Sequence, residues 1–207
     1  MDNNIFEMID KYARELSLME GYRKDVYKIM VNLAGNCYET ADGADFADLA
    51  IEDIKAVSQE DSAHPIEARL LSADNEINAL VLSRTPYCFQ AAKRGIPLIA
   101  ALDDLAQIVG YQIRTCAYTE KAVAEALKEA TGCFIKGKGV TITTGRDLYE
   151  AVVALTVLEK NAEVNLKAEA LGGVEPLPKA EAKLMRMIYK KKYSVAEREV
   201  KSKEGKA

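Results

Sequence analysis

The spacing of apolar residues divides the chain into short helices and strands. Apolar side chains recur at three- and four-residue intervals between Ile5 and Leu16, which predicts an amphipathic helix. The next apolar run, Asp25–Asn32, is too short for its period to distinguish a strand from a second helix. A helix with Pro65 in its first turn and an apolar strand over Ala79–Leu82 follow.

The middle of the chain continues in alternating helices and strands. Thr85–Pro86 ends the apolar strand, and Tyr87–Lys93 suits a short helix. Residues 103–109 predict another helix, and Tyr111–Cys116 alternates in the manner of one continuous strand. Residues 119–130 return to helical spacing.

Two strands and two helices are predicted for the last third of the chain. Cys133–Ile135 and Val140–Thr143 read as strands that Lys136–Gly139 joins as a hairpin. A long helix begins near Leu148 and ends before Gly172–Gly173, and a final helix covers residues 180 to about 193, with a loose tail beyond it.

Composition places the chain among globular proteins. Of its 207 residues 49% are hydrophobic and 29% charged, which is ordinary for a globular protein. A chain of this length can bury a sizeable hydrophobic core. It contains no apolar run long enough to span a bilayer, and its polar start lacks the basic and apolar regions of a signal peptide. The four cysteines form no CxxC pair. We therefore expect a cytoplasmic protein with reduced thiols and no membrane partner.

Charge separates the C-terminal end from the rest. Residues 179–207 contain ten Lys or Arg and four Glu, a net charge of +6, which leaves −10 for residues 1–178. We therefore treat residues 1–178 as the main domain and residues 179–207 as a basic helix and tail. Because glutamates interrupt the basic residues, a solvated helix is favoured over a nucleic-acid contact.

Several motifs resemble the class II aldolase/adducin family. Residues 79–87, Ala-Leu-Val-Leu-Ser-Arg-Thr-Pro-Tyr, lie without a gap over the family's A-V-V-H-T-H-P-P-Y strand. Residues 137–151 are similar to its N-H-G-V-V-V-x-G-x-D-L-x-E-A signature, and Gly95-Ile-Pro97 to its G-x-P turn. The segments Leu158-Glu-Lys-Asn-Ala162 and Ala170-Leu-Gly-Gly173 resemble its L-E-x-x-A and A-L-G-G helix.

The resemblance implies a three-layer α/β/α fold with a central, mainly antiparallel sheet, and a homotetramer with sites between subunits. It also implies a zinc ion held by three histidines, which stabilises the enediolate formed when a sugar-phosphate carbon–carbon bond breaks. In this chain, however, the three histidine positions fall on Leu82, Arg84 and Lys138. Leucine has no donor atom and the other two are cations, so we expect no zinc and no other cofactor.

The two cations suggest a different kind of site. If the fold is kept, Arg84 and Lys138 converge where the metal would be and could hold a carboxylate or phosphate. Solvated surface charge is the simpler alternative, and a Schiff base on Lys138 is a further one. Gly35–Asn36 could be the family's turn that binds phosphate through backbone N–H groups, or a plain turn.

His64, the chain's one histidine, and Glu67 have the spacing to share a helix face and are also candidate ligand-binding residues. The family's acid/base falls on Ala63 in a gapless count, which leaves the catalytic residues unassigned. The leading hypothesis is a metal-free class II aldolase-like protein, catalytically degenerate or binding a small sugar-phosphate-like anion. One alternative is an active aldolase or epimerase with a metal on His64, Glu60 and Glu67, and another is a non-enzymatic scaffold docked by its basic tail.

Overall fold

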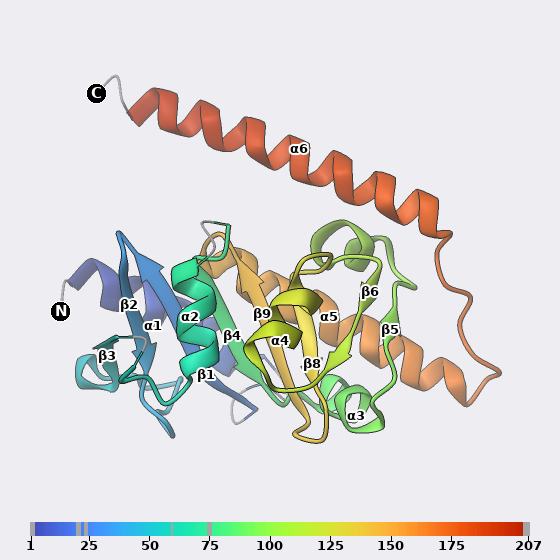
Figure 1. Ribbon diagram of the computed structural model, residues 1–207, viewed down its shortest axis with the longest axis horizontal. Coiled ribbons are helices and arrows are strands. Elements are labelled where there is room, and N and C mark those ends of the chain that lie inside the picture. Colours follow the sequence, from blue (N-terminus) through green and yellow to red (C-terminus); the bar gives the residue numbers. More distant parts are fainter. Residues whose placement is uncertain (1–2, 20–21, 23–24, 59, 74–75, 205–207) are drawn as a thin grey trace.

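A seven-stranded sheet forms the centre of the molecule (Figure 1). The structure is a computed structural model, and it describes residues 3–204 apart from 20–21, 23–24, 59 and 74–75. The strand order is β3-β2-β1-β4-β9-β8-β7, and all neighbours are antiparallel except β7 and β8. The strands are β1 (Val26–Leu33), β2 (Asn36–Thr40), β3 (Ile54–Val57), β4 (Ala79–Ser83), β7 (Thr115–Cys116), β8 (Gly132–Ile135) and β9 (Val140–Gly145), and β5 (Leu98–Ile99) pairs with β6 (Gln112–Ile113) in a second sheet.

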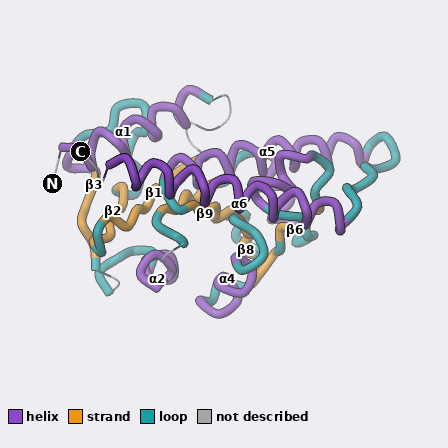
Figure 2. The backbone as a smooth tube through the Cα atoms, turned by 90° about the horizontal axis from the view of Figure 1, so that it is seen from above, coloured by secondary structure: helices purple, strands orange, loops and turns teal. Residues whose placement is uncertain are grey.

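Helices cover both faces of the main sheet (Figure 2). On one side lie α2 and α4, and on the other lie α1, α3 and α5. The helical segments are α1 (Asn3–Leu18), η1 (Ile51–Asp53), α2 (Pro65–Ala73), α3 (Pro86–Arg94), η2 (Leu105–Val109), α4 (Glu120–Leu127), α5 (Leu148–Glu169) and α6 (Lys179–Glu204). The predicted three-layer α/β/α fold with a mainly antiparallel sheet is therefore confirmed.

The strand β4 is apolar throughout because both of its faces are covered. Val81 packs with the core of α1 and α5, whereas Leu80 and Leu82 pack on the opposite face with α2 and α4. All five residues of β4 are buried. A strand buried on both faces reads as a continuous apolar run, and this is the pattern that predicted it.

Two predicted segments have a different structure. The ambiguous run at Asp25–Asn32 is the strand β1, which pairs with both β2 and β4. The single strand predicted over Tyr111–Cys116 is wrong, because the chain divides at Arg114. Ile113 pairs with Leu98 in the small sheet, whereas Thr115 pairs with Phe134 in the main sheet. Alternation predicts an extended chain but not its pairing partner.

The basic C-terminal segment forms one long helix, α6, which contacts the domain beside η2 (Figure 1). The helix runs to Glu204, so the predicted end near residue 193 is too early. Residues 194–204 are rich in Glu, Lys, Arg and Ala, which favour helix. None of the described helices has the length and hydrophobicity needed to cross a membrane. Residues 1–2 and 205–207, the ends of the predicted start and tail, lie outside the described part.

Candidate functional site

Arg84 and Leu82 lie at the carboxyl end of β4, but in different surroundings. Leu82 is buried in the core between the sheet and α2, opposite Lys28 of β1 and Ile142 of β9. Arg84 follows the strand, is exposed, and donates its backbone N–H to the carbonyl of Asp25 over 2.6 Å. Leu82 is therefore a packing residue, and Arg84 alone of this pair can reach a ligand.

The Arg84 guanidinium lies over the ring of Tyr27, with its central carbon 5.3 Å from the ring centroid. Burial raises the pKa of Tyr27 to about 12, although the charge of Arg84 opposes this rise. The ring of His64 is also near Tyr27, with its centroid 6.5 Å from that of the tyrosine ring. Tyr27 thus connects the β4 cation with the histidine of the chain.

Lys138 lies in the turn between β8 and β9, and its Nζ is 3.8 Å from the centroid of the Tyr118 ring. This is an attractive cation–π contact. The turn is held in place at Gly139, which has a φ of +64° and approaches the ring of Phe89 so closely that an added Cβ would lie 2.5 Å from it. The tight packing on α3 therefore positions Lys138.

The hydroxyl of the same tyrosine, Tyr118, donates a hydrogen bond of 2.9 Å to Oε2 of Glu67. Glu67 lies in the first turn of α2 and is fully buried, and its Oε1 has no hydrogen-bond partner among the described residues. Burial, together with the Glu67 carboxylate, raises the pKa of Tyr118 well above its ordinary value. An unsatisfied buried carboxylate oxygen is uncommon in native structures and is a candidate for a ligand or water contact.

An ion pair between a buried lysine and an exposed aspartate lies beside these contacts. Lys28 is buried, and its Nζ is 2.6 Å from the Thr40 carbonyl oxygen and 2.5 Å from Oδ1 of Asp42. The same Asp42 oxygen is 3.7 Å from Nε2 of His64. Hydrogen bonding from Lys28 is the main cause of a lowered pKa of Asp42. Lys28 is therefore neutralised within the protein.

These residues form one group at this end of the sheet, which we call the tyrosine–cation cluster. The charges of Glu67 and Asp42 contribute to the raised pKa of Tyr27, and Tyr27 contributes to the raised pKa of Tyr118. The separate contacts are therefore close enough to interact electrostatically. Within the described part of the chain, neither Arg84 nor Lys138 forms an ion pair with a carboxylate. The members of the cluster are Tyr27, Lys28, Asp42, His64, Glu67, Arg84, Tyr118 and Lys138.

Gly35 and Asn36 do not belong to this cluster. They lie at the exposed turn between β1 and β2, at the end of β1 that is remote from the cluster. Gly35 has a φ of +85° there, which the tight turn requires. Its N–H is bound by Oδ1 of Asn32 at 3.1 Å. Both line a separate shallow pocket with Glu60 and Ser72. The structure thus brings together Arg84, Lys138, His64 and Glu67, and places Gly35–Asn36 elsewhere.

Four members of the cluster were not singled out from the sequence: Tyr27, Lys28, Asp42 and Tyr118. Lys28 gave one signal, because a charged residue interrupts an otherwise apolar strand. Asp42 directly precedes Gly43, a pair of residues that is typical of turns. Neither signal identifies a partner, since the contacts join segments that are distant in sequence.

The donor set does not fit the zinc site that the family resemblance implies. Leu82 is a core residue and Arg84 and Lys138 are cations, which repel a metal ion. Within the described residues, no group of three or more His, Cys, Asp or Glu is placed to hold a metal. Glu60, one ligand of the alternative metal set, lines the pocket of Gly35 and Asn36.

These observations define the class of protein: a three-layer α/β domain with a polar cluster at the end of its central strand. The chain belongs to the class II aldolase and adducin N-terminal domain family, whose model matches residues 17–166. No curated protein matches the chain in sequence.

Solved structures support the same fold. An L-fuculose 1-phosphate aldolase superposes with a TM-score of 0.82 at 19% identity, over 92% of this chain and 98% of the other. The L-fuculose-1-phosphate aldolase of Thermus thermophilus gives a TM-score of 0.69 at 20% identity, over 83% and 97% of the two chains. A sugar-phosphate aldolase of Thermotoga maritima gives 0.61 at 15% identity, over 83% and 99%. At these identities the likeness concerns the fold.

Proposed function

We propose that the protein binds a small anion of the sugar-phosphate type at the tyrosine–cation cluster and does not perform zinc-dependent aldol cleavage. The observation that carries this proposal is that the charges of Arg84 and Lys138 are not neutralised by an ion pair within the described part of the chain. Both are exposed and lack a carboxylate partner among the described residues, yet each is held over a tyrosine ring. Lys28, in contrast, is neutralised by Asp42.

The chemistry of the two cations suits a phosphate. A guanidinium offers a planar fork of N–H donors and an ammonium a compact charge, and both bind phosphate oxygens. The tyrosine rings restrict the rotamers of the two side chains, which reduces the entropy lost on binding. The buried Oε1 of Glu67 can accept a hydrogen bond from a ligand hydroxyl or from a water that accompanies it.

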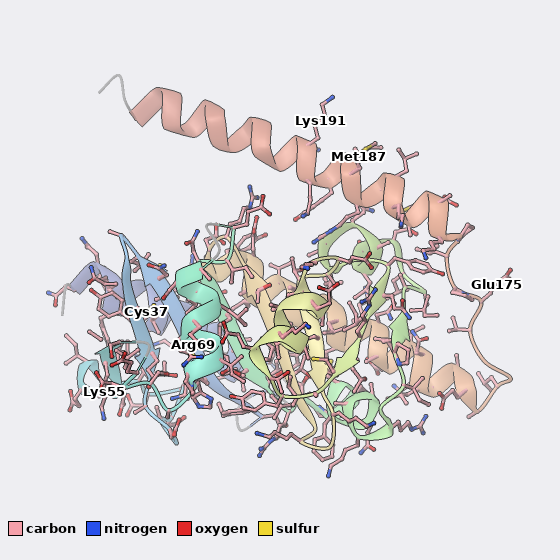
Figure 3. The ribbon with its side chains drawn as sticks, viewed as in Figure 1. Cys37, Lys55, Arg69, Glu175, Met187 and Lys191 are labelled. Carbon is pink, nitrogen blue, oxygen red and sulfur yellow. The ribbon has the colours of Figure 1, made fainter. Side chains whose placement is uncertain are left out.

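Calorimetric titration with L-fuculose 1-phosphate and with inorganic phosphate tests the proposal. Arg84→Ala and Lys138→Ala should each weaken binding about tenfold or more, the effect of losing a charge-assisted hydrogen bond. Lys55→Ala is the matched control, because Lys55 is an exposed cation on the edge strand β3 (Figure 3). Affinity that is unchanged in both site variants would refute the proposal.

Metal analysis tests the other half of the proposal. Protein purified without chelator should contain far less than one equivalent of zinc or manganese, and added zinc should not promote cleavage of the sugar phosphate. A stoichiometric metal that is lost in His64→Ala would instead favour an active enzyme with altered ligands.

A second proposal concerns assembly. The residues Leu184, Met187 and Ile188 occupy one face of α6, each is more than half exposed, and Met187 points away from the domain (Figure 3). We propose that a second copy of the chain covers this face, because residues 179–207 carry +6 and residues 1–178 carry −10. Light scattering should show a smaller particle for Met187→Glu and not for Leu171→Glu, an exposed apolar site outside α6. Equal particle mass for both variants would exclude this interface.

A further inference from the structure

A cavity of about 650 Å³ lies between α6 and the domain, far from the tyrosine–cation cluster. One side is formed by four residues of α6, namely Arg186, Tyr189, Lys190 and Lys191, and the other by the junction of β9 with α5 at Gly145. The turn that carries Lys138 is at the opposite end of β9. This cavity is therefore a separate place on the molecule, and its volume is in the range of small-molecule sites.

The walls of the cavity combine an apolar part with many charged groups. The apolar part consists of Ile77, Ile108, Leu127, Ala130, Tyr149, Val153 and Tyr189. Thr131 and Thr144 also line it, and the Thr131 hydroxyl donates to the Ile108 carbonyl over 3.0 Å. An apolar surface next to charged groups suits an organic ligand that itself carries a charge.

Most charges around the cavity are already paired. Arg146 binds Glu150 through several hydrogen bonds, of which one is 2.9 Å from its backbone N–H. Lys128 pairs with Glu125 at 2.6 Å, and Glu129 with Arg114 at 3.2 Å. The remaining carboxylate of the lining, Glu76, has a partner of its own, as does Lys191.

Two cations of the lining form no direct ion pair with a carboxylate within the described part of the chain: Arg186, on which the charge of Glu150 acts from a distance, and Lys190. They are one helical turn apart and so lie on the same face of α6. Nη1 of Arg186 donates to the carbonyls of Gln107, at 2.8 Å, and Ile108. Its Nε is buried and has no partner among the described residues, and burial lowers the pKa of the guanidinium.

A purely structural role for Arg186 accounts for only part of this arrangement. Its Nη1 satisfies carbonyls at the end of η2 and so attaches α6 to the domain. That role does not require a cavity beside the guanidinium, nor does it satisfy Nε. Glu150 is close enough for its charge to act on Arg186, but its hydrogen bonds go to Arg146. A bound anion would therefore give the partly buried guanidinium a direct counter-charge.

We propose that this cavity is a second ligand site, which takes an amphipathic anion: an apolar, ring-sized body that carries a phosphate, sulfonate or carboxylate. The anionic group binds Arg186 and Lys190, and the body packs against Ile108, Tyr149 and Tyr189. Because the ligand contacts both α6 and the domain, its binding holds α6 in place.

Phenyl phosphate is a suitable probe, titrated by calorimetry into the full-length chain with Arg84→Ala and Lys138→Ala already present. That background removes the first proposed site, so failure of either proposal can be recognised separately. Phenyl phosphate should bind, while phenol, which lacks the anion, and inorganic phosphate, which lacks the ring, should each bind at least about tenfold more weakly.

Variants then locate the binding. Arg186→Gln and Lys190→Gln should each reduce the affinity for phenyl phosphate about tenfold, whereas Lys192→Gln, an exposed neighbour outside the lining, should leave it unchanged. Lys190 is exposed, so its variant remains informative if Arg186→Gln fails to fold. Equal affinity in Lys190→Gln and Lys192→Gln, or no binding of phenyl phosphate at millimolar concentration, would overturn the proposal.

Discussion

Lys28 and Asp42 form an ion pair whose two members have very different surroundings. The Lys28 side chain is 1% exposed and the Asp42 side chain 67% exposed, yet their charged atoms are 2.5 Å apart. The position of Lys28 in the buried strand β1 therefore removes its ammonium group from water, and the charge that neutralises it comes from Asp42, which lies in the loop after β2. This difference makes the pair asymmetric toward mutation.

We expect Asp42→Asn to destabilise the protein by about 1–2 kcal/mol, because it leaves the buried ammonium of Lys28 without a counter-charge. Lys28→Met should cost less, since it removes the charge that needs a partner. Urea unfolding at pH 7 compares the two variants with the parent. A larger loss for Lys28→Met would show that the ion pair itself is the stabilising element.

The same pair predicts a pH dependence. The pKa of Asp42 is lower in the folded protein than its ordinary value of 3.8, because Lys28 binds the charged form. The unfolded state thus takes up the proton first, and the contribution of Asp42 is full above pH 3.8 and lost as pH falls through the lower folded value. The stability difference between parent and Asp42→Asn should shrink below that pH. A difference that stays constant from pH 6 to pH 3 would contradict this assignment.

The buried Glu159 of α5 organises the start of α3 next to Arg84. Its carboxylate accepts hydrogen bonds from the Thr85 hydroxyl at 2.7 Å and from the backbone N–H groups of Tyr87 and Cys88, both at 2.8 Å. It replaces the side-chain cap that Thr85 does not provide. Glu159→Gln should cost about 1–3 kcal/mol, because its amide places a donor toward these donors.

Thermal unfolding of Glu159→Gln measures this cost, with Lys160→Gln as the exposed control on the same helix. Since Arg84 precedes Thr85, the Glu159 variant should also bind anions more weakly at the tyrosine–cation cluster. Unchanged stability and unchanged anion affinity would show that Glu159 does not position this segment.

The fold could be predicted from the sequence further than the site. The apolar run of β4 and the hairpin around Lys136–Gly139 are local patterns, and both appear in the structure. The segment Leu158-Glu-Lys-Asn-Ala162 resembles a motif of the family, but the sequence alone does not show what its polar residues do. Glu159 caps α3, and Asn161 binds the backbone of Ala101 and Leu102 at 3.0 and 3.2 Å.

The tyrosine–cation cluster shows why the remainder could not be predicted. Tyr118 meets Glu67 across a separation of 51 residues, and Tyr27 meets Arg84 only because β1 and β4 are neighbours. These contacts depend on strand order, which hydrophobic periodicity does not determine. The division of Tyr111–Cys116 between two sheets was missed for the same reason.

The two glycines of the β8–β9 turn provide a matched pair of variants. Gly137 and Gly139 have φ values of +75° and +64°, but an added Cβ meets open space at Gly137 and the Phe89 ring at Gly139. Gly137→Ala should cost about 1 kcal/mol from the backbone conformation alone. Gly139→Ala should cost about 2–3 kcal/mol, because the ring must also move. Equal unfolding energies for the two variants would show that the contact with Phe89 does not hold the turn.

Tyr27 provides a test of the cluster at high pH. Burial raises its pKa from 10.0 to about 12, so the folded state favours the neutral phenol more strongly than the unfolded state does. Its contribution to stability should be full below pH 10 and lost as pH rises through 12. The stability of Tyr27→Phe relative to the parent should therefore increase over this interval in urea unfolding experiments. Because the charge of Arg84 holds this pKa down, Arg84→Ala should raise it further, and the phenolate absorbance lost in Tyr27→Phe should appear at higher pH. Titration of this phenol near pH 10 in both proteins would mean that Tyr27 is solvated and that Arg84 is not seated on its ring.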